Sequence, residues 1–172
     1  MKRILLDTSV YGRLAEDPEV VEVLIEGLSK EFIIYGNDTI RKELRETPKY
    51  VKHSGKNLRI LLLSIYKNLT KEKHELIHNK LIETLSSDYF REYKNQGGSH
   101  SNVSMKNDLT IIATATIYNL DIVISDDEKT MLSRSAINAY TITNSLYGLR
   151  NPRFLPYKIF KLKLKNHEVF PV

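Results

Sequence analysis

The sequence predicts an α/β fold in which a central, mainly parallel sheet is flanked by helices. Four short strand-like runs alternate with segments whose apolar residues recur at helical spacing. This alternation is typical of parallel sheets, because each strand returns across the sheet through a helix. The 172 residues, 41% of them hydrophobic, are enough for one domain with its own core.

The first half of the chain is expected to run strand, helix, strand, helix. Short apolar runs at residues 2–6 and 32–35 predict two buried strands. After Asp17-Pro18, apolar residues follow helical spacing for about three turns; aspartate can cap a helix, and proline suits its first position. A second helix is expected over residues 39–46, ending before a proline.

The second half continues the alternation after a longer helical stretch. Helical spacing across residues 56–95, broken near Asn68-Leu69-Thr70, predicts a helical insertion. Ser104 can cap the next helix, which leads into a strand over residues 120–125. A short helix and a last strand near residues 139–142 would complete the sheet. The whole chain, 1–172, is then one domain with a basic C-terminal extension from about residue 144.

Composition limits the classes of function. The chain has no cysteine, which excludes disulfides and thiolate metal sites and suits a reducing cytoplasm. Its formal net charge is +5, which is compatible with a polyanionic partner such as nucleic acid. No apolar run approaches the length that spans a bilayer. We therefore expect a cytoplasmic protein with no membrane partner.

Acidic residues follow two of the predicted strands directly. Asp7 ends the first strand, and the doublet Asp126-Asp127 ends the strand over residues 120–125. In an open parallel sheet the functional crevice lies outside the carboxyl ends of the strands. Asp108, near the start of the preceding helix, should reach the same edge if the crossover is right-handed, and Glu43 lies on the inward side of its helix.

Each of these acids also has a purely structural explanation. Asp7, Asp126 or Asp127 could cap the helix that follows it, Asp108 could favour a helix amino end, and Glu43 could be solvated. Their shared edge favours a site instead. Crowded carboxylates repel one another unless a cation neutralises them, and hard oxygen ligands suit Mg²⁺ or Mn²⁺. Such an ion can activate water and stabilise a phosphodiester under attack.

Three sequence blocks resemble the PIN-domain family. ILLDTSV resembles that family's first strand and its Asp-Thr-Asn element, TIRKEL its second acidic element, and NDLTIIATATIYNLDIVISDD its helix-strand unit with the last two acids. The resemblance covers about residues 2–143. It implies a three-layer PIN-like fold, cleavage of RNA that depends on Mg²⁺ or Mn²⁺, frequent homodimers, and often a toxin paired with an antitoxin protein.

The resemblance also assigns residues. It implies four catalytic, metal-binding acids, with hydroxyl partners at Thr8 and Ser125. The acids are Asp7, Glu43, Asp108 and Asp127, with Asp126 as the alternative to Asp127. Two features depart from the family: Ser9 stands where the family commonly has asparagine, and the helical stretch and the tail are longer than a minimal member needs.

A competing motif suggests a zinc peptidase. His74-Glu75-Leu76-Ile77-His78 matches H-E-x-x-H, in which two histidines on one helical face bind zinc and the glutamate is the general base. The surrounding lysines and glutamates and the lack of an obvious third ligand disfavour this hypothesis.

The C-terminal segment is basic. Lys161 and Lys163 alternate with leucines as in an amphipathic edge strand, and with Lys158 they are candidate nucleic-acid contacts; lysines also protect a sheet edge from aggregation. Tyr157 and Phe160 could stack on unpaired bases or lie in the core. A third possibility is therefore a nucleic-acid-binding protein on the same fold without catalysis.

Overall fold

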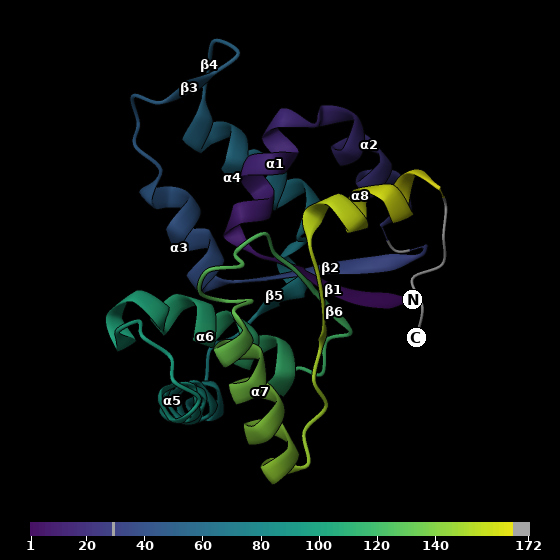
Figure 1. Ribbon diagram of the computed structural model, residues 1–172. Coiled ribbons are helices and arrows are strands. Elements are labelled where there is room, and N and C mark those ends of the chain that lie inside the picture. Colours follow the sequence, from purple (N-terminus) through teal and green to yellow (C-terminus); the bar gives the residue numbers. More distant parts are fainter. Residues whose placement is uncertain (29, 167–172) are drawn as a thin grey trace.

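The computed structural model describes residues 1–28 and 30–166, and its centre is a five-stranded sheet in the order β5-β2-β1-β6-β7 (Figure 1). Every strand pair in this sheet is parallel. The strands are β1 (Lys2–Leu6), β2 (Phe32–Asn37), β5 (Glu75–Leu76), β6 (Ile122–Ile124) and β7 (Arg153–Leu155). The predicted α/β fold with a mainly parallel sheet is confirmed.

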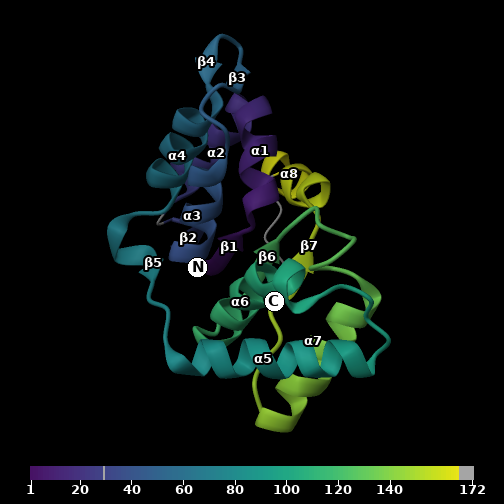
Figure 2. The same ribbon diagram turned by 90° about the vertical axis from the view of Figure 1, so that its left-hand side faces the viewer.

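Helices cover both faces of the sheet. One layer contains α1 (Thr8–Glu16), α2 (Pro18–Gly27), α4 (Leu58–Leu69) and α8 (Tyr157–Lys165). The other contains α5 (Lys80–Asn95), α6 (Asn102–Ile117) and α7 (Arg134–Tyr147). Figures 1 and 2 show the sheet between these layers, so the core has three layers. Because both faces of β1 are covered, Ile4, Leu5 and Leu6 are fully buried, as a central parallel strand requires.

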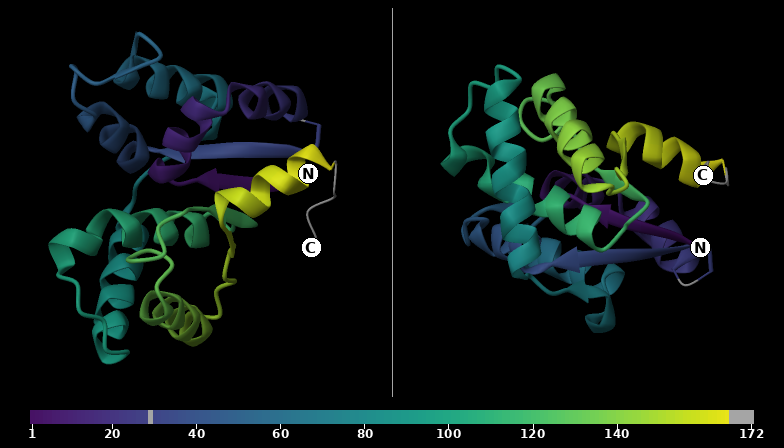
Figure 3. Two further views of the ribbon diagram at one scale, coloured as in Figure 1. Left: turned by 45° about the horizontal axis from the view of Figure 1, so that its top comes forward. Right: turned by 90° about the horizontal axis from the view of Figure 1, so that it is seen from below.

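The carboxyl ends of the central strands define one edge of the sheet. Figure 3 shows the arrows of β1 and β2 pointing the same way, and β6 runs parallel to β1, with Leu6 beside Ile124. At this edge α1 follows β1, and α3 (Asp38–Glu46) follows β2 with Asn37 as its N-cap. Polar residues that directly follow β1, β2 and β6 therefore lie at the same edge.

Three strand predictions are confirmed and one is wrong. Residues 2–6, 32–35 and 122–124 are in β1, β2 and β6, whereas residues 139–142 lie inside α7. Ala139 and Tyr140 are buried in this helix. A short apolar run between polar residues can belong to a buried strand or to the buried face of a helix, so the sequence does not distinguish the two. The short helix expected after Asp127 is a turn.

The long helical stretch contains a strand that the sequence does not reveal. Between α4 and α5 lie a short 3-10 helix, η1 (Glu72–His74), and β5, which pairs with the end of β2. The helix after residue 100 also begins earlier than predicted, because Ser101 rather than Ser104 is its N-cap.

The predicted C-terminal edge strand is wrong, because residues 157–165 form α8. Its buried residues are Tyr157, Phe160 and Leu164, which lie on one helical face. Over so short a segment, the alternation of lysine and leucine fits both the two-residue period of a strand and the 3.6-residue period of a helix. The last residues of this prediction, 167–170, lie outside the described residues. In the described part of the chain, no helix is long and apolar enough to cross a membrane.

Candidate active site

Asp7 lies where β1 ends and α1 begins. Its Oδ2 accepts hydrogen bonds from the hydroxyls of Ser9 and Ser125, at 2.8 and 2.9 Å, and from the Ser9 amide at 3.4 Å. Asp7 therefore caps α1, as its alternative explanation from the sequence allowed, and it also joins α1 to the end of β6. The residue is only 5% exposed. Burial outweighs these hydrogen bonds and raises the pKa of Asp7 above its ordinary value.

The carboxylate of Asp126 contacts α1 and α8 rather than the other acids. Its Oδ2 pairs with Arg13 Nε at 3.1 Å, and its Oδ1 accepts a hydrogen bond from the Tyr157 amide at 2.8 Å. These contacts tie the turn after β6 to α1 and to the first residue of α8. Asp126 thus has a structural role, which favours Asp127 as the acid that faces the site.

Asp127 organises the turn after β6. Its Oδ1 accepts hydrogen bonds from the amides of Lys129 and Thr130, at 3.1 and 2.9 Å, and its own amide donates to Ser125 Oγ at 3.0 Å. Its Oδ2 is in contact with the Thr130 hydroxyl, which also contacts Asp108 Oδ2. One hydroxyl has one proton, so Thr130 cannot donate to both carboxylates at once.

Asp108 lies on α6, and its surroundings shift its pKa strongly. Burial raises its pKa to about 7; the hydrogen bond from Thr130 lowers it, and the nearby charges of Asp127, Asp7 and Glu43 raise it. All three other predicted acids therefore act on this one carboxyl group. The structure brings together the four acids that the sequence predicted.

Glu43 reaches the same edge from α3. Its Oε2 accepts a hydrogen bond from the Thr8 hydroxyl, and its Oε1 accepts one from Asn107 Nδ2 at 2.8 Å. Glu43 therefore connects α3 to α1 and to α6. These partners hold the side chain toward the acidic edge, rather than leaving it in solvent as its alternative explanation proposed.

The donor chemistry of this cluster suits a hard divalent cation. Asp7, Glu43, Asp108 and Asp127 supply only carboxylate oxygens. Within residues 1–28 and 30–166, no three His, Asp or Glu side chains come close enough as they stand to hold one ion. The hydroxyl of Thr130 lies between two of the acids, so a bound ion would replace hydroxyl contacts that the carboxylates now make.

Sequence reasoning missed several residues that position the acids. Arg13 neutralises Asp126, Asn107 holds Glu43, and Thr130 links Asp108 to Asp127. Asn107 directly precedes one acid and Thr130 follows another by three residues, but polar residues at such places are too common to be a signal. Ser9, which departs from the family pattern, contacts Asp7 through its hydroxyl.

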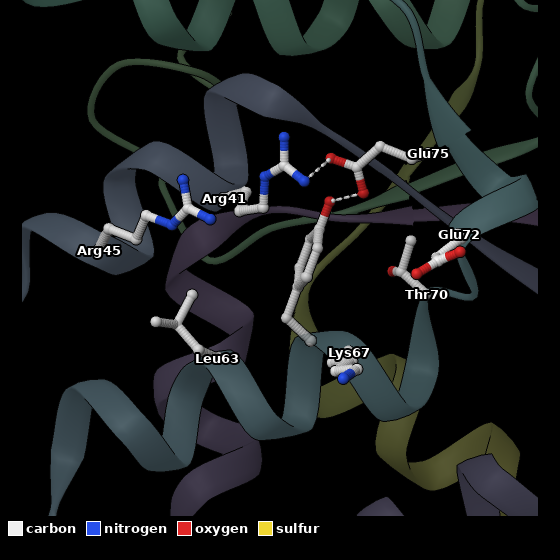
Figure 4. A pocket seen from close by; sticks show the side chains of 8 residues that line it. Arg41, Arg45, Leu63, Lys67, Thr70, Glu72 and Glu75 are labelled. Carbon is white, nitrogen blue, oxygen red and sulfur yellow. Dashed lines mark hydrogen bonds and ion pairs between the residues drawn. The ribbon is translucent and has the colours of Figure 1, made fainter.

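The predicted zinc motif is not on a helix. His74 ends η1, Glu75 is in β5, and His78 lies in the segment after it, so the two histidines do not share a helical face. Glu75 instead accepts a hydrogen bond from the Tyr66 hydroxyl at 2.7 Å and pairs with Arg41 at 3.5 Å (Figure 4). The helical placement on which the zinc-peptidase hypothesis depended is wrong.

The histidines of this motif have separate partners. The ring of His74 packs against Tyr35, with 5.3 Å between centroids, and burial, with Lys73 and Lys71 nearby, lowers its pKa. His78 Nε2 lies 3.1 Å from a carboxylate oxygen of Glu83.

The predicted nucleic-acid contacts lie on α8. Lys161 pairs with both carboxylate oxygens of Asp17, at 2.8 Å each, and Tyr157 donates to the same carboxylate at 2.9 Å. Tyr157 and Phe160 are buried and offer no ring for stacking on a base. Lys161 has a structural partner, and Lys158 remains exposed.

Comparison with known proteins gives a likeness of fold. No model of a protein family matches the sequence, and no curated protein matches it. The structure is similar to VapBC-1 from nontypeable Haemophilus influenzae, with 16% identity, a TM-score of 0.59, and coverage of 91% of this chain and 98% of that chain. It is also similar to VapBC2 from Rickettsia felis bound to a DNA fragment from their promoter, with 15% identity, a TM-score of 0.60, and coverage of 90% and 98%.

These structures confirm the predicted resemblance at the level of the fold. The chain has the three-layer PIN-like α/β architecture of these VapBC structures over nearly its whole length.

Proposed function

We propose that the chain is a cytoplasmic ribonuclease that hydrolyses RNA phosphodiester bonds with Mg²⁺ or Mn²⁺. The observation that carries the proposal is the gathering of four carboxylates at the carboxyl edge of the sheet. Burial and the three neighbouring acids raise the pKa of Asp108 to about 7, so a divalent cation would relieve repulsion that the protein leaves uncompensated. The similarity of the fold to the VapBC structures supports the nuclease class, because VapC is a PIN-domain nuclease.

The four acids would hold the ion, and their neighbours would fix them. Bound there, the ion supplies activation of water and stabilisation of charge on the phosphodiester. Ser9 and Ser125 hold Asp7, while Thr8 and Asn107 hold Glu43. Each carboxylate is thus oriented by a hydroxyl or amide from a neighbouring element, which is the support that a precise site needs.

Cleavage of a mixed single-stranded RNA by the purified protein tests the proposal. The reaction is run in Mg²⁺, in Mn²⁺ and in excess EDTA, with the wild type and with Asp7→Asn/Asp108→Asn. We expect cleavage in at least one metal, and its loss both in EDTA and in the double variant. Calorimetric titration with Mn²⁺ gives a second measurement, in which the wild type binds and the double variant binds at least about tenfold more weakly.

Two results would contradict the proposal. Cleavage that persists in the double variant would come from a contaminant or from another site. RNA binding without cleavage in either metal, together with no Mn²⁺ binding, would favour the nucleic-acid-binding protein without catalysis.

We also propose a homodimer and a partner protein of the antitoxin type. The support for the partner is that the similar structures are VapBC complexes. Sedimentation of the purified chain tests the dimer; a monomer at all concentrations up to about 100 μM, a range in which even weak standard-sized interfaces associate, would contradict it.

A further inference from the structure

The connection between α3 and α4 forms a small hairpin that stands apart from the main sheet. Its strands are β3 (Lys52–His53) and β4 (Lys56–Asn57), which pair antiparallel. The two turn residues, Ser54 and Gly55, have φ angles of 49° and 76°, as in the type I′ turns that match the twist of a hairpin. Asn57 Nδ2 donates to Lys49 O at 2.6 Å and fixes the base of the hairpin.

The hairpin and its surroundings are strongly basic. Residues 47–71 contain six lysines and arginines and no aspartate or glutamate. Three exposed lysines of this segment, which we call the hairpin lysines, are Lys49, Lys52 and Lys56. None of them forms an ion pair with another described residue. None of the 21 acidic residues of the chain lies in this segment, so the segment has no negative charge of its own to balance its lysines and arginines.

An exposed aromatic ring lies next to the hairpin lysines. Tyr50 is 84% exposed, although most tyrosines of this chain are buried or half-buried. An aromatic ring among cations can stack on an unpaired base while the cations contact the phosphates. This combination favours a single-stranded nucleic acid over an acidic peptide, which would use the lysines but not the ring.

A groove connects the hairpin with the acidic edge. It has a volume of about 460 Å³, and residues from α1, the hairpin and the turn after β6 line it, among them Ser9, Arg13, His53 and Asp126. Ser9 lines the groove and contacts Asp7, so one end of the groove is one side chain away from the acidic edge. The eight residues of α1 from Ser9 to Glu16 span ~10 Å. Figures 1 and 2 show the hairpin projecting beyond α1 and α4.

We propose that the β3–β4 hairpin binds single-stranded RNA, with the hairpin lysines on phosphates and Tyr50 on a base, and guides the strand along α1 to the acidic edge. This inference rests on the proposed ribonuclease function. It moves the nucleic-acid interface from the predicted lysines of α8 to a segment that sequence reasoning left without a role.

Binding of a fluorescent single-stranded RNA, measured by anisotropy in EDTA so that no cleavage occurs, tests the inference. The variant Lys49→Gln/Lys52→Gln/Lys56→Gln is compared with Lys158→Gln/Lys163→Gln/Lys165→Gln on α8, which removes the same charge. We expect the hairpin variant to bind at least about tenfold more weakly, and its salt slope to fall by about 2, because each phosphate contact on a single strand contributes about 0.7. The α8 variant should bind RNA less than about twofold more weakly than the wild type, because the inference places no phosphate contact on α8.

Tyr50 gives an independent measurement that does not change the charge. Tyr50→Ala should weaken binding about fivefold or more, whereas Tyr50→Phe, which keeps the ring, should bind like the wild type. Equal losses in the two lysine variants, or full binding by Tyr50→Ala, would overturn the inference. RNA cleavage that the hairpin substitutions leave unchanged would also overturn it while the ribonuclease function stands. Hairpin-dependent binding without cleavage would support the interface and contradict the nuclease.

Discussion

The acidic edge and the β3–β4 hairpin differ in the sign of their charge and in how far their charged side chains are exposed to solvent. At the acidic edge, Asp7 is 5% exposed, and Asp108 shares the hydroxyl of Thr130 with Asp127. On the hairpin, the lysines and the ring of Tyr50 lie in water. A buried carboxylate without enough donors costs folding free energy, whereas an exposed lysine costs little.

Because of this difference, we expect substitutions in the two regions to change different properties of the protein. Buried carboxylates at the acidic edge cost stability, and they are the acids of the proposed metal site, so their substitutions should change both folding and catalysis. The hairpin is peripheral, so its substitutions should change binding and leave folding nearly unchanged. The predictions below test this contrast, beginning with the largest expected effect.

The two aspartates after β6 should differ sharply in activity. Asp127→Asn should lower the rate of RNA cleavage by about 10²–10⁴-fold, because a metal ion supplies several kcal/mol of transition-state stabilisation. Asp126→Asn should lower the rate by less than about tenfold, since Asp126 contacts Arg13 and the Tyr157 amide instead. Single-turnover cleavage rates measure both. Equal losses would show that the turn acts as one unit and would remove the distinction between the two acids.

The pH dependence of stability should reveal the cost of Asp108. Its pKa is about 7 in the folded protein and near 3.8 when the chain is unfolded. Between these values the folded state holds more protons, so the free energy of unfolding falls as pH rises from about 4 to 7. Asp108→Asn removes this loss, and in the absence of divalent metal it should raise Tm at pH 8 by about 2–4 °C for each kcal/mol recovered. At pH 4 it should change Tm little.

Asp121→Asn is a control of opposite sign. Burial raises the pKa of Asp121, but hydrogen bonds from the Arg3 amide and from Arg150 outweigh it and hold the pKa below its usual value. The ionised carboxylate of Asp121 stabilises the folded protein at any pH above the pKa of the unfolded chain. This stabilisation is lost as the pH falls through the lower pKa of the folded protein. Asp121→Asn should therefore lower Tm at neutral pH. If Asp108→Asn also lowered Tm at pH 8, the acidic edge would not be a site of stored repulsion.

The sequence predicts the acidic edge because strand ends carry a strong signal. Asp7 and Asp127 follow apolar strands of a parallel sheet, and such strand ends meet at one edge. The positions of Glu43 and Asp108 follow from helical spacing and the handedness of the crossover. The hydroxyl of Thr130 was not predictable, because its role depends on a turn that brings it between two carboxylates.

Short elements were the least predictable part of the fold. β5 has two residues and β7 has three, too few to show a period. The segment over residues 157–165 fits a strand and a helix equally well, and burial of Phe160 against the core decides for the helix. The hairpin was missed for a related reason: its strands have two residues each, and Ser-Gly is a weak turn signal without apolar flanks.

The smallest expected effect compares two glycines in similar left-handed backbone conformations. Gly55 has φ 76° in the hairpin turn and Gly148 has φ 65° at the C-cap of α7, and a Cβ meets no atom within 4 Å at either position. An alanine at each therefore costs conformational energy alone, about 1 kcal/mol. Gly55→Ala should weaken RNA binding by about two- to fivefold, because a distorted turn displaces the lysines on either side of it.

Gly148→Ala should lower Tm by about 2–4 °C, because it strains the C-cap of α7, a helix that packs against α5, and it should leave RNA binding unchanged. Gly55→Ala should lower Tm less, because the hairpin can open locally without unfolding the sheet. Thermal melts and anisotropy titrations of both variants measure the two effects. If Gly55→Ala lowered Tm as much as Gly148→Ala and left RNA binding intact, the hairpin would be part of the folding core, and its lysines would need another explanation.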